Sequence, residues 1–404
     1  MKKGLKILAS ALTVLMVSTV LIGCGSGNNS SGKGKNIVVW SHLNDSDIKA
    51  LDKIGQEWAK KTGNSVKFVT DKSDFQAYTA AAQSSKGPDI MFGMPHNDIG
   101  VFQKAGLLDE VPSGIINDGD YAAKSALDAV TWSGKRYAVP IAMETYALFY
   151  NTDKVKEAPK TTDELEEQAK KVGFKYDINN IYFSYAWISG NGGYVFKNNN
   201  GTLDPKDIGL GNEGAIKGYQ FIQDLVVKDK LMNADITGDI AKGDFTAKKI
   251  GFYITGAWDI EALQKAGVPF SVAPLSTING SPAKSFMTVQ SAFVSSESKN
   301  KTEAWDLMKY LISKSGTDVI YKVRHSVPVL NSDLENSDFK NDKIVSAFAE
   351  QAKVAEPMPN IPEMNAVWTP TGNNLKLLTQ GKQNSAKTAE KILEQVADGI
   401  KQMK

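Results

Sequence analysis

Strands and helices alternate through the first part of this chain, and the alternation limits the folds that it can adopt. Residues 36–40 form a continuous apolar run typical of a buried strand, and apolar residues then recur at helical spacing until Gly63, a residue type that commonly ends helices. A strand around 66–68, a helix over 75–84 and a strand over 89–92 follow. This order predicts a parallel α/β sheet with helices packed on it.

Two polar loops follow strands of this predicted sheet. Their hydrogen-bonding side chains are His42, Asn44 and Asp45 in the first loop and His96, Asn97 and Asp98 in the second. Ligands of such sheets bind beyond the carboxyl ends of the strands. We therefore expect both loops to lie on one ligand-binding rim.

The later part of the chain continues the same pattern. Asn212 is placed to cap a helix that runs to about Lys228, and residues 250–255 read as another strand. Thr302 is placed to cap a further helix, and a last amphipathic helix is expected over about 385–403.

Length and charge narrow the class of protein. A chain of 404 residues exceeds a typical single core, so two domains are expected, and 42% hydrophobic with 23% charged residues is typical of a soluble globular protein. The formal net charge is only +2 and the lysines are spread along the chain, which argues against a nucleic-acid-binding surface.

The amino terminus predicts export. Three lysines precede a short apolar stretch that contains Ser and Thr and ends before Cys24, so residues 1–23 read as a signal peptide and not as a permanent membrane span. Cys24 is the only cysteine, and Leu-Ile-Gly-Cys resembles the bacterial lipobox, which implies a lipid on Cys24. The alternative is an ordinary signal peptide with an incidental cysteine. Residues 24–35 have the composition of a flexible tether.

Patterns of known catalytic and metal sites find little support. The three histidines are His42, His96 and His325. None has the spacing of a zinc site, and neither a P-loop nor a GxSxG motif occurs. Residues 209–214 match GxGxxG, but 204–207 indicate a turn before them and not a buried strand, so dinucleotide binding is not favoured. A glycosidase needs two carboxylates, and only Glu144 suggests itself. We expect no cofactor, no metal and no catalytic activity.

Six segments, in preserved order, resemble the maltose/maltodextrin-binding protein family of ABC importers. They are residues 87–90 with 105–108, 137–144 with 149–153, 191–197, 232–235, 255–258 and 358–362. Each motif is short, but together they extend the resemblance over nearly all of residues 36–404.

The resemblance implies an α/β, two-lobed periplasmic-binding-protein-like fold, in which each lobe is a mainly parallel sheet flanked by helices. The first lobe would comprise 36–142 and 292–337, and the second 146–288 and 344–401. Ligand would lie between the lobes, and hinge closure around it would create the form that the permease recognises.

The resemblance also implies aromatic platforms for the apolar faces of sugar rings. Trp258, Trp368 and Tyr182 align with stacking residues of the family. Each could instead be a core residue, and Phe183 or Tyr185 could face the cleft in place of Tyr182.

Polar positions are carried over with more changes. Glu144 aligns with a carboxylate that accepts sugar hydroxyls, and its alternative is a salt bridge to a lysine or arginine. The family has a polar, charged loop of other residue types at His42, Asn44 and Asp45. The family's aspartate falls on Asn97 and its arginine on Asp98, while His96 matches a family histidine or serves local loop structure.

Three departures put maltose itself in doubt. A family tryptophan falls at Gly93, so one aromatic platform is missing, and a cleft glutamate falls at Asn180. Phe75 replaces an acid near the first-lobe rim and could supply aromatic surface instead.

The sequence therefore predicts a monomeric, lipid-anchored receptor on the extracytoplasmic face of the cell membrane, which delivers an oligosaccharide to an ABC permease and binds no nucleic acid. One alternative is a same-fold receptor for a polyamine, ferric ion or phosphorylated solute, although Arg136 and Arg324 are the only arginines available to an anion. The other alternative is a secreted glycan-active enzyme.

Overall fold

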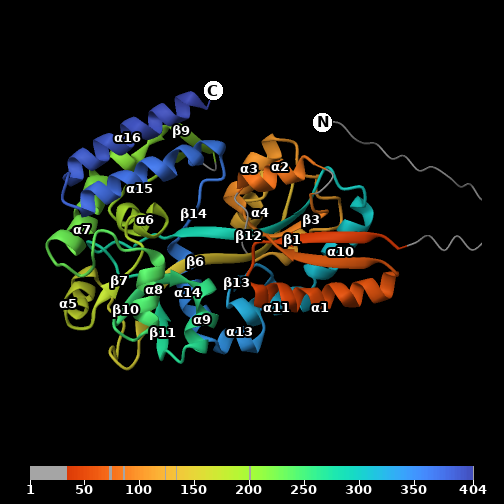
Figure 1. Ribbon diagram of the computed structural model, residues 1–404, viewed down its shortest axis with the longest axis horizontal. Coiled ribbons are helices and arrows are strands. Elements are labelled where there is room, and N and C mark those ends of the chain that lie inside the picture. Colours follow the sequence, from red (N-terminus) through yellow and green to blue (C-terminus); the bar gives the residue numbers. More distant parts are fainter. Residues whose placement is uncertain are drawn as a thin grey trace, which may run out of the picture. The chain divides into compact units, whose positions relative to one another are not determined.

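One mixed sheet runs through the described part of the chain, with helices on both of its faces (Figure 1). The computed structural model describes residues 34–71, 75–84, 87–122, 124–132, 134–199 and 202–403, with only the backbone described for 75–77. The predicted signal peptide, Cys24, most of the predicted tether and the Phe75 side chain lie outside the described residues.

The strands of this sheet come from both ends and the middle of the chain. They are β1 (Asn36–Ser41), β2 (Ser65–Thr70), β3 (Ile90–Pro95), β6 (Val139–Asn151), β7 (Phe174–Lys175), β10 (Phe252–Gly256), β11 (Phe270–Ala273), β12 (Phe286–Val294), β13 (Val327–Pro328) and β14 (Glu356–Pro357). The main path is β2-β1-β3-β12-β6-β10-β7, while β11 and β13 pair with β6 and β14 pairs with β12.

The predicted α/β class is confirmed. Strands β1, β2 and β3 form parallel ladders, as the alternation of strands and helices predicts, and β7 is parallel to β10. Strands β6 and β12 run antiparallel to each other, and the ladders β12–β3 and β6–β10 are antiparallel as well. We call β1–β3 the N-terminal part of the sheet and β7, β10 and β11 its C-terminal part.

Strand β6 belongs to both parts of the sheet. Its residues 139–145 pair with β12, and residues 146–151 pair with β10 and β11. Its side chains are buried along nearly the whole length, which explains why most of its residues are apolar and why Glu144 is its one charged residue. The predicted lobe boundaries at 142–146 and 288–292 fall inside β6 and β12, and these boundaries stay predictions.

Helices cover the sheet. They are α1 (Asp45–Thr62), α2 (Phe75–Ala82), α3 (His96–Lys104), α4 (Lys124–Asp128), α5 (Thr162–Val172), α6 (Ile181–Gly190), α7 (Glu213–Val227), α8 (Gly238–Thr246), α9 (Ile260–Lys265), α10 (Lys301–Leu311), α11 (Lys314–Arg324), α12 (Asn331–Leu334), α13 (Ser337–Asn341), α14 (Lys343–Val354), α15 (Asn365–Thr379) and α16 (Ser385–Gln402). Short 3-10 turns are η1 (Asp118–Asp120), η2 (Gly209–Gly211), η3 (Ala257–Asp259) and η4 (Pro362–Met364). None of the helices in the described ranges is long and apolar enough to cross a membrane.

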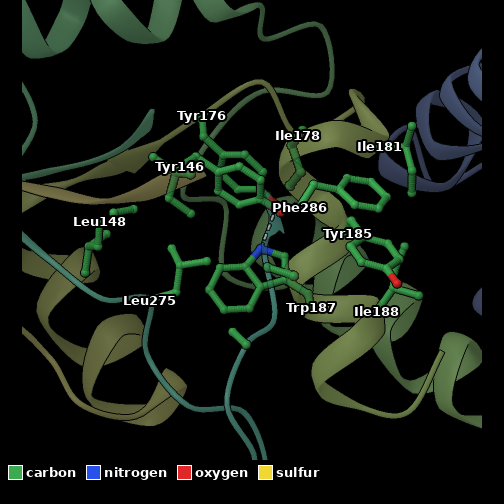
Figure 2. Close-up of a cluster of buried hydrophobic side chains, with 14 of the residues drawn as sticks. Tyr146, Leu148, Tyr176, Ile178, Ile181, Tyr185, Trp187, Ile188, Leu275 and Phe286 are labelled. Carbon is green, nitrogen blue, oxygen red and sulfur yellow. Dashed lines mark hydrogen bonds between the residues drawn. The ribbon is translucent and has the colours of Figure 1, made fainter. Parts of the chain in front are cut away.

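Separate apolar clusters stabilise the two parts of the sheet. Helix α1 packs against β2 and α10, and α10 packs against β12, with Leu51, Trp58 and Trp305 buried in the same cluster as β1 residues Ile37 and Val39. A larger cluster lies under α6, α7, α15 and α16, and Figure 2 shows its aromatic centre. There Tyr185 stacks on Phe286 with ring centroids 3.8 Å apart.

Most local predictions are confirmed. Gly63 ends α1 with φ +74°, and Asn212 caps α7 by accepting a hydrogen bond from the Ala215 amide at 2.8 Å. Two expectations were wrong. Thr302 lies inside α10, which is preceded by Asn300 at the N-cap. Residues 204–207 form no turn but belong to a strand.

That strand, β9 (Thr202–Ile208), pairs with β8 (Phe196–Asn199) in a separate two-stranded sheet; β4 (Thr131–Trp132) and β5 (Lys135–Arg136) form another. The β8–β9 register shifts between Phe196 and Lys197, so Pro205 sits at an irregularity where its missing N–H is tolerated. Because β9 is a partly exposed hairpin strand, the GxGxxG segment after it still does not follow a buried strand of the main sheet.

Candidate functional site

The loop after β1 meets the turn after β10. Asn44, which precedes α1, donates a hydrogen bond from Nδ2 to the backbone oxygen of Trp258 at 3.5 Å. Ser46 in the first turn of α1 donates from Oγ to Glu261 Oε2 at 2.7 Å. The predicted first rim loop therefore faces the segment that carries Trp258.

An aromatic group lies beside this contact; we define it as Tyr146, Tyr182, Phe183 and Trp258. The ring centroid of Tyr182 is 6.3 Å from that of Trp258 and 5.1 Å from that of Tyr146. Phe183 lies 6.4 Å from Trp258 and 5.4 Å from Tyr146. Three elements thus bring their aromatic side chains together: β6, the first turn of α6, and η3.

Exposure separates three of these rings from the core, to which the fully buried Tyr146 belongs. Tyr182, Phe183 and Trp258 are half-buried. Tyr185 is 2% exposed and donates its hydroxyl to Glu356 Oε2 at 2.5 Å, which makes it a core residue. In Figure 2, the indole of Trp187 likewise points inward and donates to the Tyr176 hydroxyl at 3.1 Å. Of the three aromatic residues considered from the sequence around 182–185, Tyr182 and Phe183 are the ones that keep accessible ring surface.

A buried network of charges adjoins the aromatic group; we call Asp47, Glu144, Gln290, Arg324 and Ser326 the carboxylate network. Glu144 accepts hydrogen bonds from Nε and Nη2 of Arg324, the latter at 3.1 Å. It also accepts from Gln290 Nε2 and from Ser326 Oγ, both at 2.9 Å. Glu144 and Tyr146 are two residues apart on β6, so their side chains leave the same face of the strand.

Arg324 joins two buried carboxylates. Its Nη1 donates to Asp47 Oδ2 at 3.1 Å, and Asp47 and Glu144 are 1% and 4% exposed. Burial would raise the pKa of Glu144, but the Arg324 guanidinium and the hydrogen bonds from Gln290 and Ser326 hold this pKa below its usual range. Burial dominates at Asp47, whose pKa is raised although Arg324 opposes the shift. Glu144 therefore forms the salt bridge that was its alternative role, and Arg324 is its partner.

Charge from this network reaches the aromatic group. Burial raises the pKa of the Tyr182 hydroxyl, and the negative charge of Glu144 raises this pKa further. The hydroxyl is consequently neutral at physiological pH and able to donate a hydrogen bond.

The second predicted rim loop forms the start of α3. His96 is buried; its Nδ1 accepts from the Val289 amide at 3.0 Å, so its Nε2 carries the proton and donates to the Met358 backbone oxygen at 3.0 Å. Burial lowers the pKa of His96 to about 4, which keeps it neutral. It connects α3 with β12 and with the segment after β14.

The two residues after His96 form a pair. Asn97 Nδ2 donates to Asp98 Oδ1 at 3.1 Å, while Asn97 Oδ1 is buried and has no hydrogen-bond partner among the described residues. Burial raises the pKa of Asp98 to about 7, although the hydrogen bond from Asn97 opposes this shift.

Other predicted residues have local partners. Asn180 caps α6 by accepting from the Tyr182 amide at 3.0 Å, so it orients the turn that carries Tyr182. Asp45 is exposed and accepts from Thr70 Oγ1 at 3.1 Å, and His42 Nε2 lies 3.5 Å from Asp71 Oδ2. Trp368 lies in the first turn of α15, half-buried against the core of the C-terminal part of the sheet. Ligand roles for these residues stay predictions.

Gly93 has a structural reason to lack a side chain. Its φ is +85°, and a Cβ built there would lie 2.4 Å from the Leu43 side chain. Because Leu43 fills the space beside β3, no aromatic platform fits at position 93 in this backbone.

Sequence reasoning missed most of the carboxylate network, although the helical pattern held a signal. Asp47 continues the buried stripe of α1 through Leu51, Ile54 and Trp58, and Arg324 continues that of α11. A charged residue on an apolar stripe must be paired. Gln290 and Ser326 carry no comparable signal.

A pocket of about 650 Å³ lies elsewhere, between α4, β8 and the segment after β14. Of the described residues considered for the ligand site, only His96 and the alternative Tyr185 line it, and both already have hydrogen-bond partners within the protein. Of its acidic residues Asp128 and Glu356, the second is bonded to Tyr185 and Lys284. Across the described ranges, no group of three or more His, Cys, Asp or Glu residues is placed to hold a metal ion. We therefore place the candidate site at the aromatic group and the carboxylate network.

Comparisons with known proteins agree with this chemistry. Residues 53–347 match the family described as bacterial extracellular solute-binding protein. The chain is 32% identical to the galactooligosaccharide-binding protein of Bacillus subtilis, over 95% of each protein. It is 28% identical to the maltooligosaccharide ABC transporter solute-binding lipoprotein of Streptococcus pneumoniae, over 99% of this chain and 98% of the relative. The solved maltose-maltodextrin binding protein of Alicyclobacillus acidocaldarius is 39% identical, with a TM-score of 0.86 over 90% of this chain and all of that one. This likeness confirms the predicted two-lobed α/β fold.

Proposed function

Because the chain belongs to the bacterial extracellular solute-binding protein family, we propose that it captures an oligosaccharide outside the cytoplasm and delivers it to an ABC importer. The family consists of binding proteins, so the glycan-active enzyme considered from the sequence is set aside.

The observation that carries the oligosaccharide proposal is the aromatic group beside the carboxylate network. Tyr182, Phe183 and Trp258 come from α6 and η3 and offer half-buried ring surface. Glu144 and its partners place hydrogen-bonding groups on the face of β6 that also carries Tyr146, next to the aromatic group. A sugar ring has apolar faces and a polar edge, so this combination fits it better than it fits a wholly apolar or a highly charged solute.

Charge distribution at the network supports a neutral ligand. Arg324 is bonded to both Asp47 and Glu144, so its positive charge is already balanced by two carboxylates. A phosphorylated solute at this site would therefore meet no free guanidinium. A neutral polyol needs no such counter-charge.

Relatives suggest which oligosaccharides to consider. Similar proteins are named for galactooligosaccharides and for maltooligosaccharides. The blocked position Gly93 removes one aromatic platform, and Asn97 and Asn180 replace charged groups, so we propose a galacto- or maltodextrin-like ligand and not maltose in particular.

Several parts of the proposal concern the protein in its setting. We propose that Cys24 carries a lipid that anchors the chain to the outer face of the cell membrane, as the name of the pneumococcal lipoprotein suggests for that relative. We also propose a monomer whose two lobes close on the ligand about β6 and β12 and then engage the permease.

A thermal-shift screen tests the ligand class. Malto- and galacto-oligosaccharides of two to five residues are added to the purified protein at about 100 times the expected Kd. A ligand that binds only the folded state then adds about 2.7 kcal/mol to the free energy of unfolding and raises the melting temperature. Trp258→Ala should lose most of that shift, while a flat response of the wild-type protein to the whole panel would overturn the proposal.

A fractionation experiment tests the anchor. We expect the wild-type chain in the membrane fraction of the producing cells and Cys24→Ser in the soluble exported fraction, because the variant has no thiol to acylate. Recovery of the wild-type chain in the soluble fraction would contradict lipid attachment at this residue.

A further inference from the structure

Glu144 has no hydrogen-bonding capacity left for a ligand. Its Oε1 accepts from Arg324 Nε and Ser326 Oγ, and its Oε2 accepts from Arg324 Nη2 and Gln290 Nε2. An ionised carboxylate offers about four lone-pair sites, and four donors fill them. A sugar hydroxyl could bond to Glu144 only by displacing one of these buried donors.

Gln290 shows the opposite situation. Its Nε2 donates to Glu144 at 2.9 Å, while its Oε1 is buried and has no hydrogen-bond partner among the described residues. The side chain is 7% exposed. Because Glu144 accepts hydrogen bonds and cannot donate them, the amide nitrogen must face it and the amide oxygen is fixed on the other side. An unpaired buried acceptor costs free energy that a donor from the ligand would recover.

A second side chain repeats this arrangement. Asn97 gives its amide nitrogen to Asp98 and leaves Oδ1 buried without a partner in the described part of the chain. The two residues belong to one region of the sheet, because Gln290 on β12 pairs with Pro95 at the end of β3, and Asn97 follows two residues later. In both side chains, a carboxylate accepts from the amide nitrogen and thereby fixes the direction of the amide oxygen. This oxygen is an acceptor, and a hydroxyl group is a suitable donor to it.

We propose that Gln290 makes the ligand contact at the carboxylate network, accepting a hydrogen bond at Oε1 from a hydroxyl of the bound saccharide. Glu144 and Arg324 then act as positioning residues that fix the orientation of the Gln290 amide. This inference rests on the proposed oligosaccharide-binding function. It assigns direct hydroxyl recognition to a neutral amide in place of the carboxylate that the family resemblance suggested.

Calorimetric titration of the full chain with deoxy sugars tests the assignment. The probes are maltotriose and β-1,4-galactotriose, each with a set of monodeoxy analogues. Gln290→Met removes the acceptor at nearly constant volume and should weaken binding of the parent sugar by about tenfold or more. One deoxy analogue should lose the same factor with the wild-type protein and lose nothing further with Gln290→Met, since both changes remove one hydrogen bond.

Three variants separate contact from positioning. Ser326→Ala removes another donor to Glu144 and leaves the Gln290 oxygen intact, so the sensitive deoxy position should be unchanged. Glu144→Gln should weaken binding, yet the same deoxy analogue should keep its full loss. Gln290→Asn keeps the amide but shortens the side chain, so it serves as the substitute if Gln290→Met folds poorly. In Gln290→Asn, too, the sensitive deoxy analogue should lose no further affinity relative to the parent sugar.

The outcomes distinguish this inference from the proposed function. The inference would be overturned if Gln290→Met bound the parent sugar within twofold of the wild-type affinity. It would also be overturned if the affinity loss of the deoxy analogue disappeared in Glu144→Gln and not in Gln290→Met. Oligosaccharide binding would stand in both cases. Wild-type protein that binds neither parent sugar would overturn the proposed function and this inference with it.

Discussion

Replacing Arg324 by methionine tests the carboxylate network most directly. The substitution keeps much of the side-chain volume and removes the cation between Asp47 and Glu144, which are 1% and 4% exposed. Removing one partner of a buried ion pair costs about 3–5 kcal/mol, because the remaining charges stay buried and unpaired. Domains are usually stable by only about 5–15 kcal/mol, so a loss of this size is readily measured.

The loss should depend on pH. In the wild-type protein, the pKa of Glu144 is held below its usual range, so this residue contributes stability above its unfolded pKa. Without Arg324, burial raises the folded pKa of both carboxylates above their unfolded values. The folded variant then binds more protons than the unfolded chain between these values, and its free energy of unfolding increases as the pH falls through that window. The difference between wild type and Arg324→Met should therefore shrink from pH 7.5 to pH 5.

Urea unfolding followed by far-ultraviolet circular dichroism at the two pH values provides the measurement. The other arginine offers a matched control. Arg136 bonds to the exposed Asp118 at the surface, so Arg136→Met should change stability little at either pH. Adding Glu144→Gln to Arg324→Met should restore part of the loss, because one stranded charge is removed. A loss below about 1 kcal/mol without pH dependence would refute the buried network.

Three further predictions concern single side chains. The pKa of His96 is lowered from 6.5 to about 4, so the free energy of unfolding of the wild-type protein decreases as the pH decreases through this range. His96→Gln should make this decrease smaller in urea unfolding at pH 7 and 4.5, and an equal decrease in both proteins would contradict the assignment. The pKa of Asp98 is raised from 3.8 to about 7, so Asp98→Asn should raise the free energy of unfolding at pH 8 and change it little at pH 4; equal effects at both would count against a buried carboxyl. Gly93 and Gly106 both have positive φ, so an alanine at either position should cost about 1–2 kcal/mol of stability. Gly93→Ala should destabilise the protein more, because only at this position would the new Cβ clash with a neighbour, the Leu43 side chain. Equal melting temperatures of the two variants would refute the clash.

Sequence patterns foresaw the elements whose signals are local. The strand–helix–strand order from Asn36 and the caps at Gly63 and Asn212 depend on neighbouring residues, and the structure confirms them. Residues 204–207 misled the prediction because Asp-Pro-Lys-Asp has turn composition. Their strand character comes from pairing with β8, and the register shift there tolerates the proline.

The candidate site was foreseen only in part, because its partners are distant in the chain. Tyr182 and Trp258 were singled out by resemblance, and the structure places their rings 6.3 Å apart. The ion pair of Glu144 with Arg324 spans 180 positions, and nothing in the residues around Glu144 indicates that partner. An unpaired atom such as the Gln290 oxygen becomes visible only when every neighbouring donor has been assigned.

Two kinds of contact differ in strength around this site. The loop after β1 is joined to the turn after β10 by single, partly exposed hydrogen bonds, from Ser46 to Glu261 and from Asn44 to Trp258. The carboxylate network is buried, and its members hold one another by several charge-assisted bonds. Separation of the rim loop from Trp258 would therefore break the first kind and leave the second intact. We expect the Gln290 amide to keep its orientation in an open form of the protein. The loss of conformational freedom on ligand binding would then be confined mainly to the rim loop and the aromatic group as they close.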